Sequence, residues 1–202
     1  MSGATEAATL VLTMVDDTQL YLDAASLISQ RRYKAAFGIY SELANRGYPA
    51  CRAYAGWMLY EGVGVEKDRE RAIDCFRQAA EEGSREGMFY LGRVLTAKGQ
   101  HADAIPWYQE AAALRYPPAL YRLGIAHLEG TGVVRNRGLG LELLQQAASA
   151  GNVLAKRKIA IEFISGRFGI RRVFAGLCLL LGTLGFAWRA AKASESPEEF
   201  LG

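Results

Sequence analysis

Apolar residues recur along most of the chain at the three- and four-residue spacing of an amphipathic helix, in segments separated by short polar turns. The segment Ala-Ile-Asp-Cys-Phe-Arg-Gln-Ala-Ala from Ala72 matches Ala-Ile-Pro-Trp-Tyr-Gln-Glu-Ala-Ala from Ala104. Related segments contain Ala36 and Gly140, and the four anchors lie 36, 32 and 36 residues apart. This pattern predicts an all-α fold, an α-solenoid of about five helix-turn-helix repeats.

Each predicted repeat has a first helix with a glycine at the same place, and these glycines are Gly56, Gly92 and Gly124. Glycine costs about 1 kcal/mol against alanine inside a helix, so its recurrence indicates close packing on the neighbouring second helix. Second helices are expected to end in left-handed caps at Gly47, Gly83 and Gly151. In the third hairpin we expect Pro117 and Pro118 to stop the helix, because proline lacks an amide proton.

The pattern also divides the chain into segments. Residues 1–16 form an N-terminal extension, and residues 17–188 form the repeat domain, beginning its first hairpin near Leu20. Within it, residues 171–192 form an apolar helix with basic residues at both ends. The polar tail, residues 193–202, is expected to be disordered.

One repeat carries Leu-Tyr-Glu-Gly-Val-Gly-Val from Leu59, then Asp68 and, further on, Gly83. A second carries His-Leu-Glu-Gly-Thr-Gly-Val from His127, with Arg-Asn in place of the acidic position. These residues resemble the Sel1-like repeat, a relative of the tetratricopeptide repeat. The repeat that starts at Gly87 lacks four loop residues and is closer to a plain tetratricopeptide unit. The resemblance covers residues 20–184 and implies a helical fold that binds other proteins.

Composition excludes some classes of function. The chain has 24 basic and 21 acidic residues, a net charge of +3, which gives no support to nucleic-acid binding. Basic residues concentrate in 152–192, where eight face a single acid, Glu162. The three cysteines, Cys51, Cys75 and Cys178, lie far apart in apolar helical patterns, so we expect buried thiols in a reducing compartment.

No residue pattern indicates catalysis. The glycine pairs of Gly62-Val-Gly64 and Gly130-Thr-Gly132 have no preceding strand, so they predict tight inter-helix turns and not phosphate loops. The two histidines, His101 and His127, have no cluster of metal ligands around them in the sequence, and His127 is expected to pack in the core. We therefore expect no catalytic residue, no metal site, no cofactor and no enzymatic activity.

The related tetratricopeptide arrays line a concave groove with their first helices. Matching around the shared glycines gives six candidate partner-binding residues: Trp57, Tyr60, Phe89, Arg93, Tyr121 and Ile125. Aromatic and arginine side chains are the usual anchors of a peptide groove. Aromatic residues at helical spacing also occur in cores, and this alternative stays open.

The last repeat departs from the others because its outward positions are apolar. The apolar run 173–188 would span about 24 Å as a helix, short of the roughly 30 Å of a hydrocarbon core. Three explanations stay open: contact with a membrane surface, contact with a partner or a second copy, and ordinary core packing. The residues expected to make the membrane or partner contact are Arg171, Arg172, Phe174, Cys178, Leu181, Phe186, Trp188, Arg189 and Lys192.

These observations favour a non-enzymatic scaffold or adaptor that docks on a membrane-associated protein complex. The segment Gly-Arg-Phe-Gly-Ile-Arg-Arg from Gly166 is similar to the tails of Sel1-like proteins encoded with bacterial exopolysaccharide machinery. That resemblance implies an accessory subunit that docks on a membrane enzyme of envelope glycan synthesis. Together with the expected reducing compartment, it leads us to expect a cytoplasmic protein, peripheral on the inner face of the cytoplasmic membrane. The alternative is a soluble interaction module, or a homodimer, without membrane contact.

Overall fold

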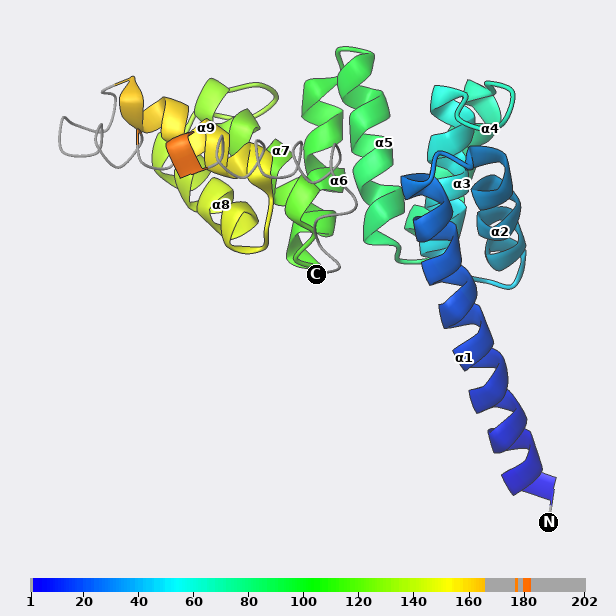
Figure 1. Cartoon of the computed structure of the whole chain (residues 1–202). Coiled ribbons are helices and arrows are strands. Elements are labelled where there is room, and N and C mark those ends of the chain that lie inside the picture. The colour runs from blue at the N-terminus through cyan, green and yellow to red at the C-terminus, as the bar shows by residue number, and fades with distance from the viewer. Residues whose placement is uncertain (1, 166–176, 178–179, 183–202) are drawn as a thin grey trace. The chain divides into compact units, whose positions relative to one another are not determined.

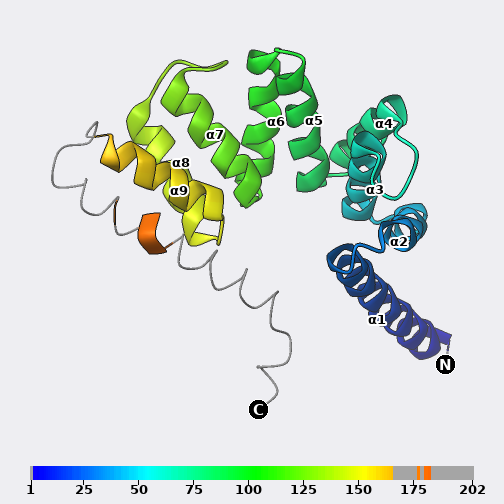
Figure 2. The same ribbon diagram turned by 45° about the horizontal axis from the view of Figure 1, so that its top comes forward.

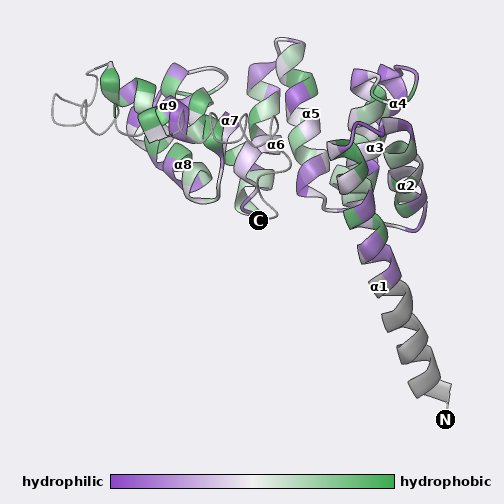
Figure 3. Ribbon diagram, in the orientation of Figure 1, coloured by the Kyte–Doolittle hydropathy of each residue, from purple (hydrophilic) through white to green (hydrophobic). Residues whose placement is uncertain are grey.

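The computed structural model describes residues 2–165, 177 and 180–182, with side chains from residue 16 onward. These residues form α-helices and connecting turns without any strand, in two compact units, Met1–Leu114 and Arg115–Gly202 (Figure 1). The all-α fold of helix-turn-helix repeats that the sequence predicted is confirmed. Each helix combines hydrophobic and hydrophilic residues, as its amphipathic pattern requires (Figure 3).

The first unit contains three helical hairpins. Their helices are α1 (Ser2–Ser29) and α2 (Tyr33–Asn45), α3 (Pro49–Glu61) and α4 (Arg69–Glu81), and α5 (Arg85–Ala97) and α6 (His101–Ala113). The second unit contains the hairpin of α7 (Pro117–Glu129) and α8 (Arg137–Ser149), followed by α9 (Val153–Ile164), which packs on α8 (Figure 2). The loops 62–68 and 130–136 are longer by four residues than the loop 98–100, as the sequence predicted.

The three shared glycines pack against the second helix of their own hairpin. A Cβ added to Gly56 would lie 2.9 Å from Cys75 Cβ, and one added to Gly92 would lie 2.6 Å from Tyr108 Cε1. On Gly124 it would lie 3.0 Å from the carbonyl oxygen of Gly140. Real Cβ atoms rarely come so close, so the predicted contacts are confirmed.

A fourth close contact joins two hairpins of the first unit and was not predicted. A Cβ on Gly87 would lie 2.6 Å from the backbone nitrogen of Ala80, at the packing of α5 on α4. The other first helices carry a small buried residue at the matching position: Cys51, Ala119 and Ala155. Within each unit, small residues at this position let a first helix pack closely on the second helix before it: α3 on α2, α5 on α4 and α9 on α8.

The predicted left-handed glycines after the second helices are confirmed, with φ of +94° at Gly47, +86° at Gly83 and +89° at Gly151. The two long loops end in equivalent N-caps, although their residues differ. Asp68 accepts a hydrogen bond from the amide of Arg71, and Asn136 accepts one from the amide of Leu139. The change from acid to amide therefore keeps the cap.

The expected role of the two prolines was wrong. Pro117 and Pro118 begin α7, where a missing amide costs nothing, and they do not end α6. The glycine's place after α6 is taken by Arg115, with φ of +54°. A side chain is unfavourable in this left-handed conformation by about 1–2 kcal/mol.

Replacing Arg115 by glycine is therefore expected to stabilise the protein, by up to about 1 kcal/mol after the larger chain entropy of glycine is counted. Arg122→Gly is the matched control, because Arg122 is an exposed residue inside α7 and the same change there should destabilise by about 1 kcal/mol. Thermal unfolding followed by circular dichroism measures both. Two shifts of the same sign would contradict the assignment.

The first helix is longer than expected. We predicted that the first hairpin begins near Leu20, but α1 begins at Ser2. Residues 4–30 contain neither glycine nor proline, so nothing in the local sequence ends the helix.

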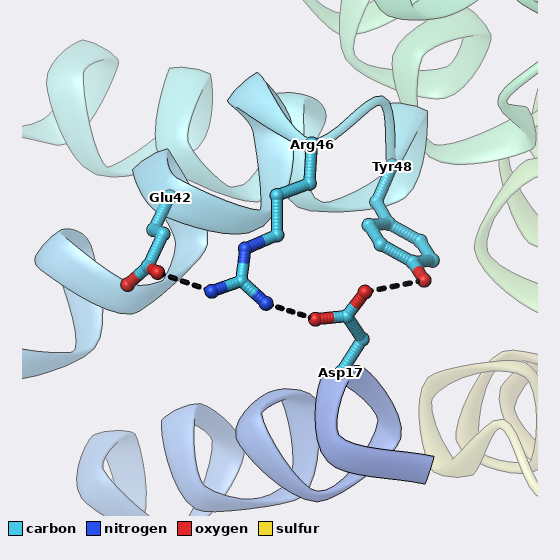
Figure 4. A network of polar contacts seen from close by, with 4 residues as sticks. All are labelled: Asp17, Glu42, Arg46 and Tyr48. Atoms are coloured by element: carbon cyan, nitrogen blue, oxygen red, sulfur yellow. Dashed lines mark hydrogen bonds and ion pairs between the residues drawn. The ribbon is translucent and has the colours of Figure 1, made fainter. Parts of the chain in front are cut away.

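Polar side chains hold α1 to the turn between α2 and α3 (Figure 4). Arg46 bridges Asp17 and Glu42, and the Tyr48 hydroxyl donates to Asp17 Oδ2 over 2.8 Å. Hydrogen bonding to Asp17 raises the pKa of Tyr48. Asp17 thus joins α1 to the turn between α2 and α3.

Candidate functional site

Three of the six predicted partner-binding residues meet in one cleft of the first unit, and we call this the α3–α5 cleft. Trp57 and Tyr60 come from α3, and Arg93 comes from α5. The remaining residues that line the cleft are Phe76, Tyr90, Val94 and Ala97. Its partly open cavity measures about 50 Å³. Pockets for whole small molecules measure about 300–1,000 Å³, so this cavity has room for a small group and not for a whole metabolite.

Aromatic rings form the floor of the α3–α5 cleft. The ring of Phe76 stacks on Tyr90 with centroids 4.9 Å apart, and the ring of Tyr60 lies 6.3 Å from that of Phe76. Burial raises the pKa of Tyr90 to about 12, so its hydroxyl stays neutral at physiological pH. Tyr90 was not among the predicted binding residues, although Tyr54 and Tyr90 both stand two residues before a shared glycine.

Two arginines border these rings. The guanidinium of Arg93 lies 5.7 Å from the centroid of Tyr90 and 3.6 Å from the Glu61 carboxylate, and that of Arg69 lies 5.5 Å from the centroid of Tyr60. The side chains of Arg93 and Glu61 are 36% and 38% exposed. An ion pair this exposed contributes little to stability, so Arg93 can exchange Glu61 for another carboxylate at low cost.

The other three candidates lie elsewhere. Phe89 is only 9% exposed and its ring packs against Tyr90 and Tyr108, so it belongs to the core, and we leave it out of the proposed binding surface. Tyr121 and Ile125 are half-buried on α7 in the second unit.

Most of the residues predicted to contact a membrane or partner lie outside the described part of the chain. These are Arg171, Arg172, Phe174, Cys178, Phe186, Trp188, Arg189 and Lys192. Leu181 is described and is 67% exposed, while the neighbouring Leu180 is half-buried. Among the described residues, no helix has the length and apolar character needed to cross a bilayer.

The glycine pairs, a cysteine thiol and a histidine are possible phosphate-binding, nucleophilic or metal-binding groups. Gly62 and Gly130 are left-handed caps at the ends of α3 and α7, so the prediction of tight turns is confirmed. Burial raises the pKa of the Cys51 thiol to about 11, which keeps it protonated. His127 is half-buried, and its Nδ1 atom is buried without a hydrogen-bond partner in the described part of the chain. Within that part, no three His, Cys, Asp or Glu residues gather as metal ligands.

Comparison with known proteins places two hairpins in one family of repeats. The model of the Sel1 repeat matches residues 49–84 and 117–152, which are the two hairpins with seven-residue loops. The structure is similar to that of a Sel1 repeat protein from Oxalobacter formigenes, with a TM-score of 0.63 and 25% identity over 78% of this chain and 67% of that one. Immunity protein Pa5087 from Pseudomonas aeruginosa shares the fold, with a TM-score of 0.64 and 22% identity over 83% and 66%.

Relatives with known names are larger proteins. The DAP3-binding cell death enhancer 1 of Mus musculus is 28% identical, over 65% of this chain and 34% of the mouse protein. Chitin synthase regulatory factor 3 of Schizosaccharomyces pombe is 27% identical, over 66% of this chain and 16% of the yeast protein. The chain therefore spans about a third or less of these relatives, and the similarity concerns their repeats.

Proposed function

We propose that this chain, two of whose hairpins match the Sel1 repeat, is a non-enzymatic scaffold that binds a protein partner at the α3–α5 cleft. The observation that carries the proposal is the meeting of Trp57, Tyr60 and Arg93 at one partly open cavity. Tryptophan, tyrosine and arginine are the residue types that dominate binding energy at protein interfaces. The names of the mouse and yeast relatives, one a binding protein and one a regulatory factor, agree with such a role.

The chemistry of the cleft favours a partner segment that carries a carboxylate beside a small apolar group. The apolar group would enter the cavity of about 50 Å³ against the rings of Phe76 and Tyr90. The carboxylate would replace Glu61 at Arg93 and gain a charge-assisted hydrogen bond.

We also propose that the partner complex is membrane-associated and that residues 171–192 bring the protein to the inner face of the cytoplasmic membrane. The support is the 67% exposure of Leu181 at a position that is polar in the preceding repeat. Machinery that makes an exopolysaccharide or another envelope glycan fits this location. The yeast relative is by name a regulator of a synthase that makes a polysaccharide.

Co-purification from native membranes tests the scaffold role. Wild-type protein should recover a stoichiometric partner, and Arg93→Ala should lower the recovery at least tenfold, because truncation at a hot spot costs about 2 kcal/mol or more. Leu22→Ala is the matched control, since Leu22 is exposed on α1 away from the cleft, and it should recover the partner fully.

Circular dichroism should show that the Arg93→Ala variant is folded. Equal recovery by Arg93→Ala and wild type would rule out the α3–α5 cleft as the binding site. A purified protein that recovers no partner and turns over a substrate would rule out the scaffold. A monodisperse homodimer that ignores membranes would favour the soluble interaction module.

A further inference from the structure

A second pocket lies in the first unit, where α1 and α2 meet the start of α3, and we call it the α1–α3 pocket. Its lining includes Asp17 and Tyr21 of α1, Leu43 of α2, and Ala50 and Cys51 of α3. The pocket is partly open and measures about 230 Å³. An apolar cavity of about 150 Å³ is large enough to bind benzene, so the α1–α3 pocket has room for an aromatic ring.

A small residue at the second position of α3 leaves this space open. In the register of the shared glycines, Ala50 of α3 matches Glu86 of α5. The Glu86 side chain is buried, and it accepts hydrogen bonds from the Ser84 hydroxyl over 3.0 Å and from Arg85 Nε over 3.1 Å. The matching position on α5 is therefore taken by a longer side chain of the protein itself. On α3 the alanine side chain is too short to fill the pocket.

Tyrosine rings form one wall of the α1–α3 pocket. The ring of Tyr21 meets that of Tyr40 edge to face, with centroids 6.1 Å apart, and it lies 6.3 Å from the ring of Tyr54. In the repeat register Tyr21 stands where α5 has Phe89, one of the predicted groove positions. Aromatic rings favour edge-to-face and offset contacts with one another, so an aromatic guest suits this wall.

Asp17 supplies the pocket with a hydrogen-bond acceptor. Its side chain is only 11% exposed, and its two oxygens accept from Arg46 and from the Tyr48 hydroxyl (Figure 4). A carboxylate has about four acceptor positions, so Asp17 can accept a further donor. A ring that carries an N–H or O–H group therefore fits the pocket better than a phenyl ring does.

The α1–α3 pocket and the α3–α5 cleft border the same side of α3. Ala50 and Trp57 are seven residues apart, which places them on one side of the helix at a distance of about 10 Å. The helix α5 packs on α3, and packed helices lie about 8–10 Å apart. Arg93 of α5 is thus roughly 13–15 Å from the pocket, a distance that about four residues of an extended peptide span.

We propose that the α1–α3 pocket binds a tryptophan or tyrosine side chain of the partner segment, four residues from the carboxylate that binds Arg93. This inference rests on the binding of a partner at the α3–α5 cleft, and it adds a second anchor to the same segment. A buried aromatic anchor is the kind of group that dominates the binding energy of an interface. Two anchors at a fixed spacing also select one segment among many acidic ones.

Binding of labelled peptides to the full chain, followed by fluorescence anisotropy, tests the proposal. The probes are Trp-Gly-Ser-Val-Asp and its reverse order, both capped at each end so that aspartate carries the only carboxylate. Matched peptides carry phenylalanine or alanine in place of tryptophan. In one of the two orders the tryptophan peptide should bind about tenfold more tightly than the alanine peptide, and about threefold more tightly than the phenylalanine peptide. This comparison changes only the peptide, so it is independent of protein folding.

The variant Ala50→Leu assigns the ring to the pocket, because leucine would fill the space that alanine leaves open. It should weaken the binding of the tryptophan peptide about tenfold and leave that of the alanine peptide unchanged. Ala102→Leu is the matched control, since Ala102 is an exposed alanine at the second position of α6, and it should bind both peptides as wild type does. Arg93→Ala should weaken both peptides.

The outcomes separate the second anchor from the cleft. Equal binding of the tryptophan and alanine peptides, with both weakened by Arg93→Ala, would overturn the second anchor and leave the α3–α5 cleft in place. A tryptophan peptide that binds Ala50→Leu as well as wild type would place its ring elsewhere and overturn the assignment of the pocket. If no peptide binds, or if Arg93→Ala changes nothing, the cleft is wrong and the second anchor is wrong with it. If light scattering shows a dimer that Ala50→Leu dissociates, a second copy occupies the pocket.

Discussion

Replacing Phe76 with alanine is expected to lower the free energy of unfolding by about 3–5 kcal/mol, the usual cost of truncating a buried phenylalanine. Phe76 is 1% exposed and is one of the largest fully buried side chains of the structure. Its ring packs against the rings of Tyr60 and Tyr90, and a Cβ added to Gly56 would lie 2.9 Å from its Cε1 atom. Alanine would leave a cavity that three helices line, and rigid helices collapse into such a space only in part.

Urea unfolding followed by tryptophan fluorescence measures this loss, because Trp57 and Trp107 both report on the first unit. Leu22→Ala, at an exposed position of α1, is the control and should change the stability by no more than about 0.5 kcal/mol. The Phe76→Ala variant should also lose partner binding, since Phe76 forms the floor of the α3–α5 cleft. A loss of stability below about 1 kcal/mol would show that the aromatic stack does not hold α3, α4 and α5 together.

Replacing Gly92 with leucine is expected to destabilise the protein by about 1–3 kcal/mol through overpacking. A Cβ alone would lie 2.6 Å from the ring of Tyr108, which is buried and whose hydroxyl lies 3.0 Å from Thr96 Oγ1. The ring has little room to withdraw, so α5 and α6 would have to separate.

Gly38→Ala is the matched control for the glycine prediction. Gly38 lies inside α2, is exposed, and has no atom within 4 Å of an added Cβ. Alanine there should stabilise the helix by about 0.5–1 kcal/mol. If the urea midpoints of Gly92→Leu and wild type agree, Gly92 is not a close-packing position, and the alignment of the shared glycines is wrong.

The sequence alone determined the repeat. A residue pattern that recurs every 32 or 36 residues predicts the period and the hairpins. Because each repeat packs its two helices in the same way, the pattern also predicts the contacts of Gly56, Gly92 and Gly124. Caps and turns were predictable for the same reason. They depend on residues close in sequence, such as Asp68 with its neighbouring amides.

Two local features of the backbone were not predicted from the sequence. The start of α1 is set by the absence of a helix-breaking residue, which leaves no positive mark in the sequence. Arg115 adopts a glycine-like conformation that its residue type opposes. The start of α1 thus agrees with local propensity, whereas the backbone of Arg115 departs from it.

The site shows where tertiary structure was required. Matching around the glycines grouped Trp57, Phe89 and Arg93 together, yet only Trp57 and Arg93 line the cleft, while Phe89 lies in the core against Tyr108. The register fixes the side of its own helix on which a residue stands. The neighbouring helix fixes whether that side is covered. Burial is a property of packing between segments distant in sequence, so the same register position is core in one repeat and surface in another.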